Sequence, residues 1–231
     1  KKFKNIINIH IQNPKISSKN FDFIISPNHD NFYGSNVINS VGALHHFNKI
    51  DKNFESKKLT CIIGGNNQHY HFGIKETNEL CNRLIKIKKN HVDINLSVIT
   101  SRRTTDLVKK ILIKKLNNIA FIWTGSGENP YNNAIHSSSF FIITSDSTSM
   151  ISEAAISGKP IYVHHLTFKR KSRRIIKFHN EFDKLGITRD LKNIEYLKNW
   201  SYNSLNESER IANIIKKKYK RKYMNLENIT T

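Results

Sequence analysis

The sequence predicts an α/β fold in which a parallel β-sheet carries helices on both faces. From about residue 57 onward, short apolar runs alternate with stretches in which apolar residues recur at helical spacing. Strands that alternate with helices are typical of parallel sheets, because each parallel connection needs a crossover. The chain has 231 residues, of which 38% are hydrophobic, so it can bury the core of one such domain and part of a second. We therefore expect a doubly wound, Rossmann-like parallel sheet over residues 57–190.

The elements of this domain can be placed in chain order. Apolar runs mark the expected strands, at residues 59–65, 94–101, 119–126, 140–146 and 160–166. Apolar residues at helical spacing, or a short polar stretch between two strands, mark the expected helices, at residues 75–90, 104–116, 129–139, 147–157 and 170–185. Thr104 or Thr105 suits the N-cap of the second helix, because a threonine hydroxyl can accept a hydrogen bond from the first turn. Gly186 is expected to end the last helix.

The segments on either side of this domain have a different pattern. Residues 1–52 contain strand-like runs with little room for helices between them, at residues 5–12, 22–26 and 36–44. We expect them to be the carboxyl-terminal part of a truncated second Rossmann-like lobe. Residues 51–57 are the expected linker, and residues 191–231 are expected to form a basic helical tail.

The formal net charge of +20 favours anionic partners such as nucleotides, acidic lipid headgroups or nucleic acid. The alternative is a general abundance of lysine, asparagine and isoleucine along the chain. Two basic patches stand out, at residues 169–174 and 216–222. The second predicts a basic helix that could rest on an anionic membrane, although a solvated tail helix is the favoured alternative.

Composition also indicates a compartment. Cys61 and Cys81 form neither a metal pattern nor a disulfide framework, which favours a reducing environment. No apolar run approaches the roughly 20 residues that span a bilayer. We therefore expect a cytoplasmic protein, with peripheral contact on the inner face of a membrane as the further option.

Ligands of open parallel sheets bind beyond the carboxyl ends of the strands, so the loops at those ends are the candidate site. These loops are polar and rich in small residues, at residues 64–73, 100–104, 124–131, 144–149 and 164–174. They supply glycines, hydroxyl groups and cations suited to a phosphate-bearing ligand. The candidate donor-binding residues are Gly64, Gly65, His69, Arg102, Arg103, Gly127, Glu128, Asn129, Asp146, Ser147, Ser149, Met150 and Glu153.

Several of these residues also have a structural interpretation. Gly64 and Gly65 could form only a tight turn, and Asp146 could cap the helix that begins at 147. Arg102 is one of two cations near a helix start, where they oppose the helix dipole, so an anion nearby is favoured. Glu153 is the strongest candidate, because a carboxylate that faces the cleft can accept hydrogen bonds from both ribose hydroxyls.

His29 and Asp30 are the candidate catalytic pair, because a histidine beside a carboxylate can act as a general base near neutral pH. The alternative is a pair that only stabilises its loop. His69 and His71 lack a third ligand at a useful spacing, so we expect no metal site. We also expect no cofactor and no specific nucleic acid, because no P-loop, no dinucleotide-binding fingerprint and no nucleic-acid motif is present.

Six motifs, in order, resemble the mitochondrial-fission "elongated mitochondria" family and its bacterial relatives. The similarity extends from residue 5 to about residue 190, and its motifs are IQNPKI (11–16), FDFIISPNHD (21–30), GGNNQHYHFG (64–73), TSRRT (100–104), GENPY (127–131) and TSDSTSMISEAAISGKPIYV (144–163). The resemblance implies a GT-B glycosyltransferase-like fold with two Rossmann-like lobes, the second of which binds a nucleotide sugar. Glu153 matches the acidic residue that contacts the ribose, and the turn from Ser145 to Ser149 matches the diphosphate region.

The favoured function is therefore a metal-independent, GT-B-like glycosyltransferase that uses a nucleoside diphosphate sugar, with a UDP-type donor preferred. The alternative is a non-catalytic adaptor at a membrane surface, because plant members of the family are linked to recruiting fission machinery to a membrane. A nucleotide-sugar epimerase is a third option, disfavoured because the dinucleotide-binding fingerprint is missing.

Overall fold

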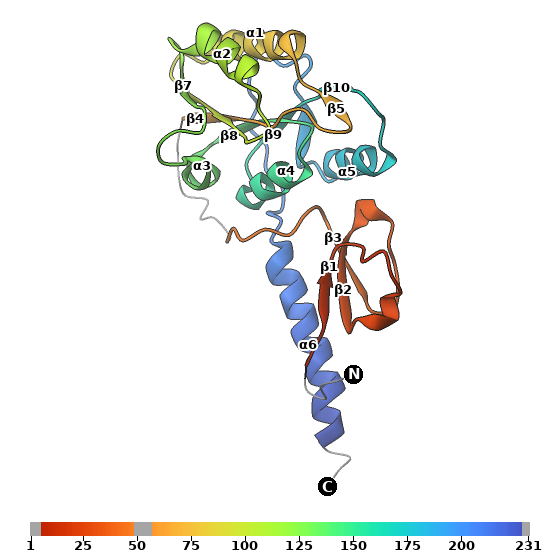
Figure 1. Ribbon diagram of the computed structural model, residues 1–231. Coiled ribbons are helices and arrows are strands. Elements are labelled where there is room, and N and C mark those ends of the chain that lie inside the picture. The colour runs from red at the N-terminus through yellow and green to blue at the C-terminus, as the bar shows by residue number, and fades with distance from the viewer. Residues whose placement is uncertain (1–5, 49–56, 228–231) are drawn as a thin grey trace. The chain divides into compact units, whose positions relative to one another are not determined.

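The computed structural model describes residues 6–48 and 57–227 (Figure 1). The chain divides into two compact units. Unit 1 comprises residues 1–47 and 206–231, and unit 2 comprises residues 48–205. The predicted linker at residues 51–57 lies outside the described residues except for Lys57.

Unit 2 is built on a parallel sheet of six strands in the order β11-β9-β8-β4-β6-β7. Its strands are β4 (Lys58–Ile63), β6 (Asn95–Thr100), β7 (Ala120–Trp123), β8 (Phe140–Thr144), β9 (Ile161–His164) and β11 (Thr188–Asp190). Within this sheet, the path of the chain leads from β4 through β6 to the edge strand β7. It then returns to place β8 on the other side of β4. The strand order therefore reverses between β4 and β8, which is the topological switch point of a doubly wound sheet.

Helices cover both faces of this sheet (Figure 1). One face carries α1 (Ile74–Asn90) and α2 (Asp106–Leu116). The other carries α3 (Tyr131–Ser137), α4 (Thr148–Ala154) and α5 (Arg173–Lys184). A short 3-10 turn, η3 (Ala155–Ser157), extends α4 and ends at Gly158, whose φ of 66° suits a glycine. The predicted doubly wound, Rossmann-like α/β fold is confirmed.

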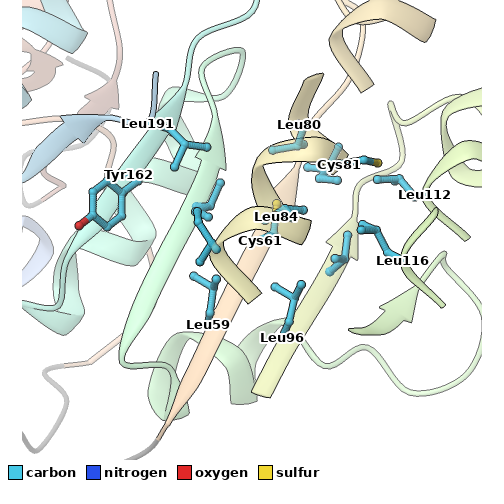
Figure 2. Packing of buried hydrophobic residues seen from close by; sticks show 14 of the residues in the cluster. Leu59, Cys61, Leu80, Cys81, Leu84, Leu96, Leu112, Leu116, Tyr162 and Leu191 are labelled. Carbon is cyan, nitrogen blue, oxygen red and sulfur yellow. The ribbon is translucent and has the colours of Figure 1, made fainter. Parts of the chain in front are cut away.

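One core cluster of unit 2 lies between the sheet and α1 and α2 (Figure 2). Leu80 and Leu84 on α1 are fully buried against Leu112 and Leu116 on α2. Each buried leucine contributes roughly 1.5–3 kcal/mol to stability, so this stripe fixes α1 and α2 on the sheet. The core also holds two free cysteines, Cys61 and Cys81. Burial raises the pKa of the Cys81 thiol to about 11 and that of Cys61 further, so both stay protonated.

Two small elements of unit 2 are absent from the sequence-based expectation. The strand β11 has only three residues and is too short to show a periodic pattern. The strands β5 (Tyr70–His71) and β10 (Thr167–Phe168) form an antiparallel ribbon inside two loops. This ribbon joins loops that follow different strands, so local sequence carries no sign of it.

The expected helical tail is wrong for residues 191–205, which contain no helix and run along the surface of unit 2. Backbone groups of this strap bond to side chains of the domain. The Lys198 N–H donates to the Tyr162 hydroxyl at 2.8 Å, and the Leu197 N–H donates to His91 Nε2 at 2.9 Å. The Tyr202 hydroxyl in turn donates to the Lys159 carbonyl at 2.8 Å. Because these partners satisfy its polar groups, the strap does not need helical hydrogen bonds.

Unit 1 has a parallel sheet of three strands in the order β1-β2-β3. The strands are β1 (Ile9–Ile11), β2 (Phe23–Pro27) and β3 (Val37–Ser40), with the 3-10 turns η1 (Ser18–Asn20) and η2 (Asn28–Asp30) in their connections. The long helix α6 (Glu207–Glu227) packs Ile211 against Phe23, Ile25 and Ile38 of this sheet. The three predicted strand-like runs are therefore confirmed. Among residues 6–48 and 57–227, none of the helices combines the length and apolar character that a bilayer crossing needs.

Candidate functional site

The turn after β4 and the turn after β8 meet at the switch point. The Gly64 N–H donates to Thr144 Oγ1 at 2.8 Å, and the Gly65 N–H donates to Asp146 Oδ2 at 3.0 Å. A Cβ atom on Gly64 would lie 2.0 Å from the Asp146 carboxylate, and one on Gly65 would lie 2.0 Å from the Arg103 carbonyl oxygen. Such contacts are impossible, so both positions require glycine for close packing. The predicted glycine turn is therefore the point where three loops converge.

A buried carboxylate holds this junction together. The side chain of Asp146 exposes no surface and lies 2.8 Å from Arg103 Nη2, while Arg103 itself keeps 41% of its side chain exposed. Burial raises the pKa of Asp146, and hydrogen bonds from Thr144 and Gly65 together with the Arg103 charge act in the opposite direction. Asp146 therefore positions Arg103 at the rim rather than presenting its own oxygens to solvent.

The alternative in which Asp146 caps the following helix is wrong. Its carboxylate points to Gly65, and the cap of α4 is Ser147, whose hydroxyl accepts a hydrogen bond from the Met150 N–H at 3.4 Å. Ser147 and Met150 are half-buried, and Ser149 is exposed. Of the two predicted serines, only Ser149 presents an uncovered hydroxyl at this turn. Because α4 has seven residues, its dipole contributes little.

Ser145 is fully buried and fixes the turn after β8 to the end of β9. Its N–H donates to the His164 carbonyl at 3.0 Å, and its hydroxyl accepts from the Leu166 N–H at 3.0 Å. His179 of α5 lies with Nε2 3.0 Å from the Ser145 carbonyl. The resemblance had assigned Ser145 to the diphosphate region, but these contacts give it a purely internal role.

The loop after β6 is bound to the same junction. The Ser101 hydroxyl donates to the Gly64 carbonyl at 3.0 Å, and the Thr104 hydroxyl donates to that carbonyl at 2.5 Å. Of the two threonines that suit the cap of α2, the structure selects Thr105. Arg102 is exposed in this anchored loop. Both arginines of the loop therefore stand on a fixed support beside the glycine turn.

The β5–β10 ribbon ties His69 to the basic loop before α5. The His69 carbonyl accepts hydrogen bonds from the Lys169 N–H at 2.8 Å and the Arg170 N–H at 3.3 Å. Tyr70 stacks on Phe168 with ring centroids 4.5 Å apart. His69 is therefore held at the rim, where its main contacts are with the ribbon. Lys169 and Arg170 add exposed cations to this side.

Glu153 lies half-buried on α4 and accepts a hydrogen bond from the Tyr131 hydroxyl at the start of α3. Burial, and then the Glu153 charge, raise the pKa of Tyr131, so the phenol stays protonated and can donate. The loop before α3 bends through two glycines with positive φ, Gly125 at 111° and Gly127 at 75°. Asn129 Oδ1 accepts the Tyr131 N–H at 3.0 Å. Three predicted residues of this loop are exposed, namely Gly127, Glu128 and Asn129.

The candidate catalytic pair lies on η2 of unit 1. His29 Nε2 is 3.8 Å from Asp30 Oδ1, and the two side chains expose only 4% and 10% of their surfaces. A buried ring beside a carboxylate favours the interpretation in which the pair stabilises its loop. Their use in catalysis stays a prediction.

Most of the chain matches one known family. The family described as "Mitochondrial fission ELM1" matches residues 1–219. The chain belongs to the mitochondrial fission ELM1 family. It is 28% identical to the uncharacterized protein RP120 of Rickettsia prowazekii (strain Madrid E), over 94% of this chain and 74% of that protein. It is 25% identical to the mitochondrial fission protein ELM1 of Arabidopsis thaliana, over 93% of this chain but only 58% of that protein.

A solved structure similar to this ELM1 family member is a putative UDP-N-acetylglucosamine 2-epimerase from Listeria monocytogenes. The TM-score is 0.47 and the sequence identity 12%, over 87% of this chain and 61% of that chain. This likeness concerns the fold alone, which the strand order of the six-stranded sheet already establishes.

The motifs by which the sequence resembles the ELM1 family include both loops and buried elements, since the motif at 144–163 continues through α4 into β9 and the motif at 21–30 contains β2. In unit 2, four of them form the rim at the carboxyl ends of β4, β6, β7 and β8. Tyr131 belongs to one of these motifs but was missed as a functional residue, because its partner Glu153 lies 22 residues away. Spacing along the chain gives no sign of that pair. This contact could be predicted only from the topology, which brings α3 beside α4.

One hollow among the described residues of unit 2 lies away from this rim. It has a volume of about 1050 Å³ and lies at the amino ends of the strands, with Lys57, Phe140, Pro160 and Trp200 in its wall. Among the described residues of this ELM1 family member, no group of three or more histidine, cysteine, aspartate or glutamate residues could hold a metal ion. The convergence of loops, rather than the size of the hollow, marks the candidate site.

Proposed function

We propose that this protein binds a nucleoside diphosphate sugar at the carboxyl edge of the six-stranded sheet and acts as a GT-B-like glycosyltransferase. The observation that carries the proposal is the junction of Gly64 and Gly65 with the Asp146–Arg103 pair at the switch point. Open parallel sheets bind ligands in the crevice at this point. The two glycines let Asp146 and the Arg103 loop pack closely together, and a guanidinium held there matches the geometry of phosphate oxygens.

Each residue of the rim has a role in this proposal. Arg102 and Arg103 neutralise the diphosphate, and the exposed hydroxyl of Ser149 donates to it. Glu153 accepts hydrogen bonds from the ribose hydroxyls, since a carboxylate can accept several donors. Contact with the base is assigned to the exposed loop of Glu128 and its neighbours. A UDP-type donor is the favoured class.

The transfer step follows from these contacts. The oxygen of the acceptor hydroxyl forms a bond to the anomeric carbon, the bond between that carbon and the diphosphate oxygen breaks, and the hydroxyl proton passes to a base. Negative charge develops on the departing diphosphate, where fixed cations stabilise the transition state more than the ground state. Arg103, held by Asp146, supplies such a cation without a metal ion. His29 or Asp30 is the proposed base.

Titration calorimetry of the full chain with UDP, GDP and ADP tests this proposal. We expect UDP to bind with a dissociation constant in the micromolar-to-millimolar range. Glu153→Gln should weaken this binding about tenfold or more, since a hydrogen bond to a charged group contributes roughly 1.5–3 kcal/mol. Glu181→Gln on α5 is the matched control, and it should bind UDP as the unaltered protein does. An absence of binding to all three nucleotides at millimolar concentration would overturn the proposal.

A second function, an adaptor at an anionic membrane surface, is favoured by one observation on α6. Beyond the buried Ile211, the helix presents four exposed lysines among residues 216–220, and two more cations follow at 221 and 222 in the sequence. Each cation near an anionic surface contributes about 1 kcal/mol, so such a cluster could hold the protein on a membrane.

Liposome sedimentation separates the two functions. The adaptor should bind vesicles that contain phosphatidylserine, lose that binding between about 0.1 and 0.5 M salt because of screening, and keep it in Glu153→Gln. Exchange of Lys216, Lys217 and Lys218 for glutamine should abolish sedimentation without changing UDP binding. Equal sedimentation with neutral vesicles would contradict the adaptor function.

A further inference from the structure

We infer that Tyr131 is a positioning residue that holds the Glu153 carboxylate in the orientation that recognises the ribose hydroxyls. The inference rests on the proposed donor site and goes beyond it, because Tyr131 itself need not touch the ligand. The Tyr131 hydroxyl donates to Glu153 Oε2, and the two residues come from neighbouring helices on one face of the sheet.

A phenol is a suitable group to fix a carboxylate in this position. It has one O–H to donate, and an ionised carboxylate offers about four lone-pair sites, so a single phenol leaves capacity for the sugar. Glutamate has three rotatable bonds, and a half-buried glutamate without a fixed partner would sample several rotamers. By holding one oxygen, Tyr131 lowers the entropy lost when the ligand binds.

Tyr131 is itself held by the chain around it. Asn129 Oδ1 accepts its N–H at 3.0 Å, and Pro130 at the N-cap of α3 starts the helix with a carbonyl that accepts the Ala134 N–H at 2.8 Å. The loop before these residues turns through glycines with positive φ, which bring Asn129 into place. The phenol is therefore presented from a rigid turn rather than from a mobile loop.

The bond could instead serve only to tie α3 to α4. The two roles differ in what they change. A hydrogen bond that only ties the two helices contributes to stability, and its loss weakens the binding of every ligand at the rim to the same extent. A positioning role affects only the part of the ligand that Glu153 contacts, so its loss reduces discrimination between ribose and 2′-deoxyribose while the diphosphate contribution stays.

The test compares the affinities of UDP and 2′-deoxy-UDP by titration calorimetry. We expect the unaltered protein to prefer UDP on the order of tenfold, as one hydrogen bond to a charged group suggests. Tyr131→Phe, which removes only the hydroxyl, should reduce that preference to about threefold or less, and Glu153→Gln should reduce it at least as far. Tyr202→Phe is the matched control, because its hydroxyl bonds to the Lys159 carbonyl at the strap, and it should leave the preference unchanged.

The outcomes separate the inference from the proposed function. If Tyr131→Phe keeps the full preference while Glu153→Gln loses it, the positioning role is overturned and the donor site stands. The positioning role is overturned in the same way if Tyr202→Phe loses as much preference as Tyr131→Phe. If the unaltered protein binds neither nucleotide, the proposed function fails and this inference fails with it.

A second variant covers the case in which Tyr131→Phe does not fold. Asn129→Ala removes the exposed carboxamide that fixes the Tyr131 N–H, and it should reduce the UDP preference by a smaller factor, about twofold. Thermal melting checks that each variant is folded. An Asn129→Ala protein with the full preference would overturn the inference in that case.

Discussion

The two edges of the six-stranded sheet are built in opposite ways. At the carboxyl edge, three loops close on one another through glycines, hydroxyl groups and the buried Asp146 carboxylate, which holds the partly exposed Arg103. At the amino edge, Leu197 and Trp200 of the strap of residues 191–205 line a hollow of about 1050 Å³. The comparison teaches that a hollow alone does not mark the candidate site, because the glycines, the Asp146 carboxylate and Arg103 converge at the other edge.

The largest effect is expected from filling the glycine junction. Gly65→Ala would place a methyl group 2.0 Å from the Arg103 carbonyl, so the β4 and β6 loops must separate. We expect a loss of roughly 3 kcal/mol or more in the free energy of unfolding, measured by urea denaturation, together with the loss of UDP binding. Gly127→Ala is the control: it has a positive φ but open space around it, and it should cost about 1 kcal/mol. Equal losses of stability in the two variants would contradict the close packing assigned to Gly65.

A pH effect of similar size is expected at the end of β9. Burial, followed by the charges of Arg83 and His165, lowers the pKa of His164 from 6.5 to about 4. A histidine with a depressed folded-state pKa must be neutral to stay buried, so its stability contribution is full above about pH 6.5 and is lost as the pH falls toward 4. The loss should approach about 3 kcal/mol, because one pKa unit corresponds to 1.36 kcal/mol.

Urea denaturation at pH 7 and pH 4.5 measures this loss. A His164→Gln variant should show a smaller difference between the two pH values than the unaltered protein. The prediction fails if both proteins lose the same stability.

An intermediate effect is expected at the amino edge. Trp200 lies 4.2 Å below the Arg189 guanidinium, meets Tyr162 edge-on, and donates its indole N–H to the Gly186 carbonyl. Trp200→Ala should cost about 2–3 kcal/mol of stability, because a half-buried indole and a cation–π contact are lost. UDP binding, measured by calorimetry under conditions where the variant is folded, should not change. A loss of UDP binding would indicate that the nucleotide binds at the amino edge instead.

The smallest effects are expected from substitution of the two rim arginines, and these effects on UDP binding should differ between Arg103 and Arg102. Arg103 is held by Asp146, whereas Arg102 is exposed in the same loop. Arg103→Gln is expected to weaken UDP binding about tenfold and Arg102→Gln about threefold, because a preorganised cation loses less entropy on binding. Calorimetry at 0.05 and 0.3 M salt should show a weaker salt dependence in both variants. A larger effect at Arg102 would contradict the role given to Asp146.

Much of unit 2 could be predicted from the sequence, because buried strands and amphipathic helices leave periodic apolar patterns. The segments that escaped prediction have a short or non-local basis. Three residues of β11 are too few for a pattern, and the ribbon of Tyr70 and Phe168 pairs residues almost 100 positions apart. The strap bonds to Tyr162 and Lys159, so its polar sequence reads as a helical tail when those partners are unknown.

The candidate site shows the same division. The sequence places Gly64, Gly65 and Arg103 at strand ends, and the structure brings these residues together. It could not show that Asp146 would choose Gly65 over the helix that follows, because both offer a free N–H to the carboxylate. It could not show the contact of Glu153 with Tyr131 either. Which partner a polar side chain takes depends on topology, and composition and spacing are silent on that choice.

The route of the chain through unit 1 has a consequence for synthesis on the ribosome. The strands of that unit are made first, but the helix that covers their apolar face, α6, is made only after all of unit 2. At 5–20 residues per second, Phe23, Ile25 and Ile38 wait on the order of ten seconds or more for Ile211. During that interval α6 does not yet cover the apolar face of these strands, which is then open to binding by chaperones.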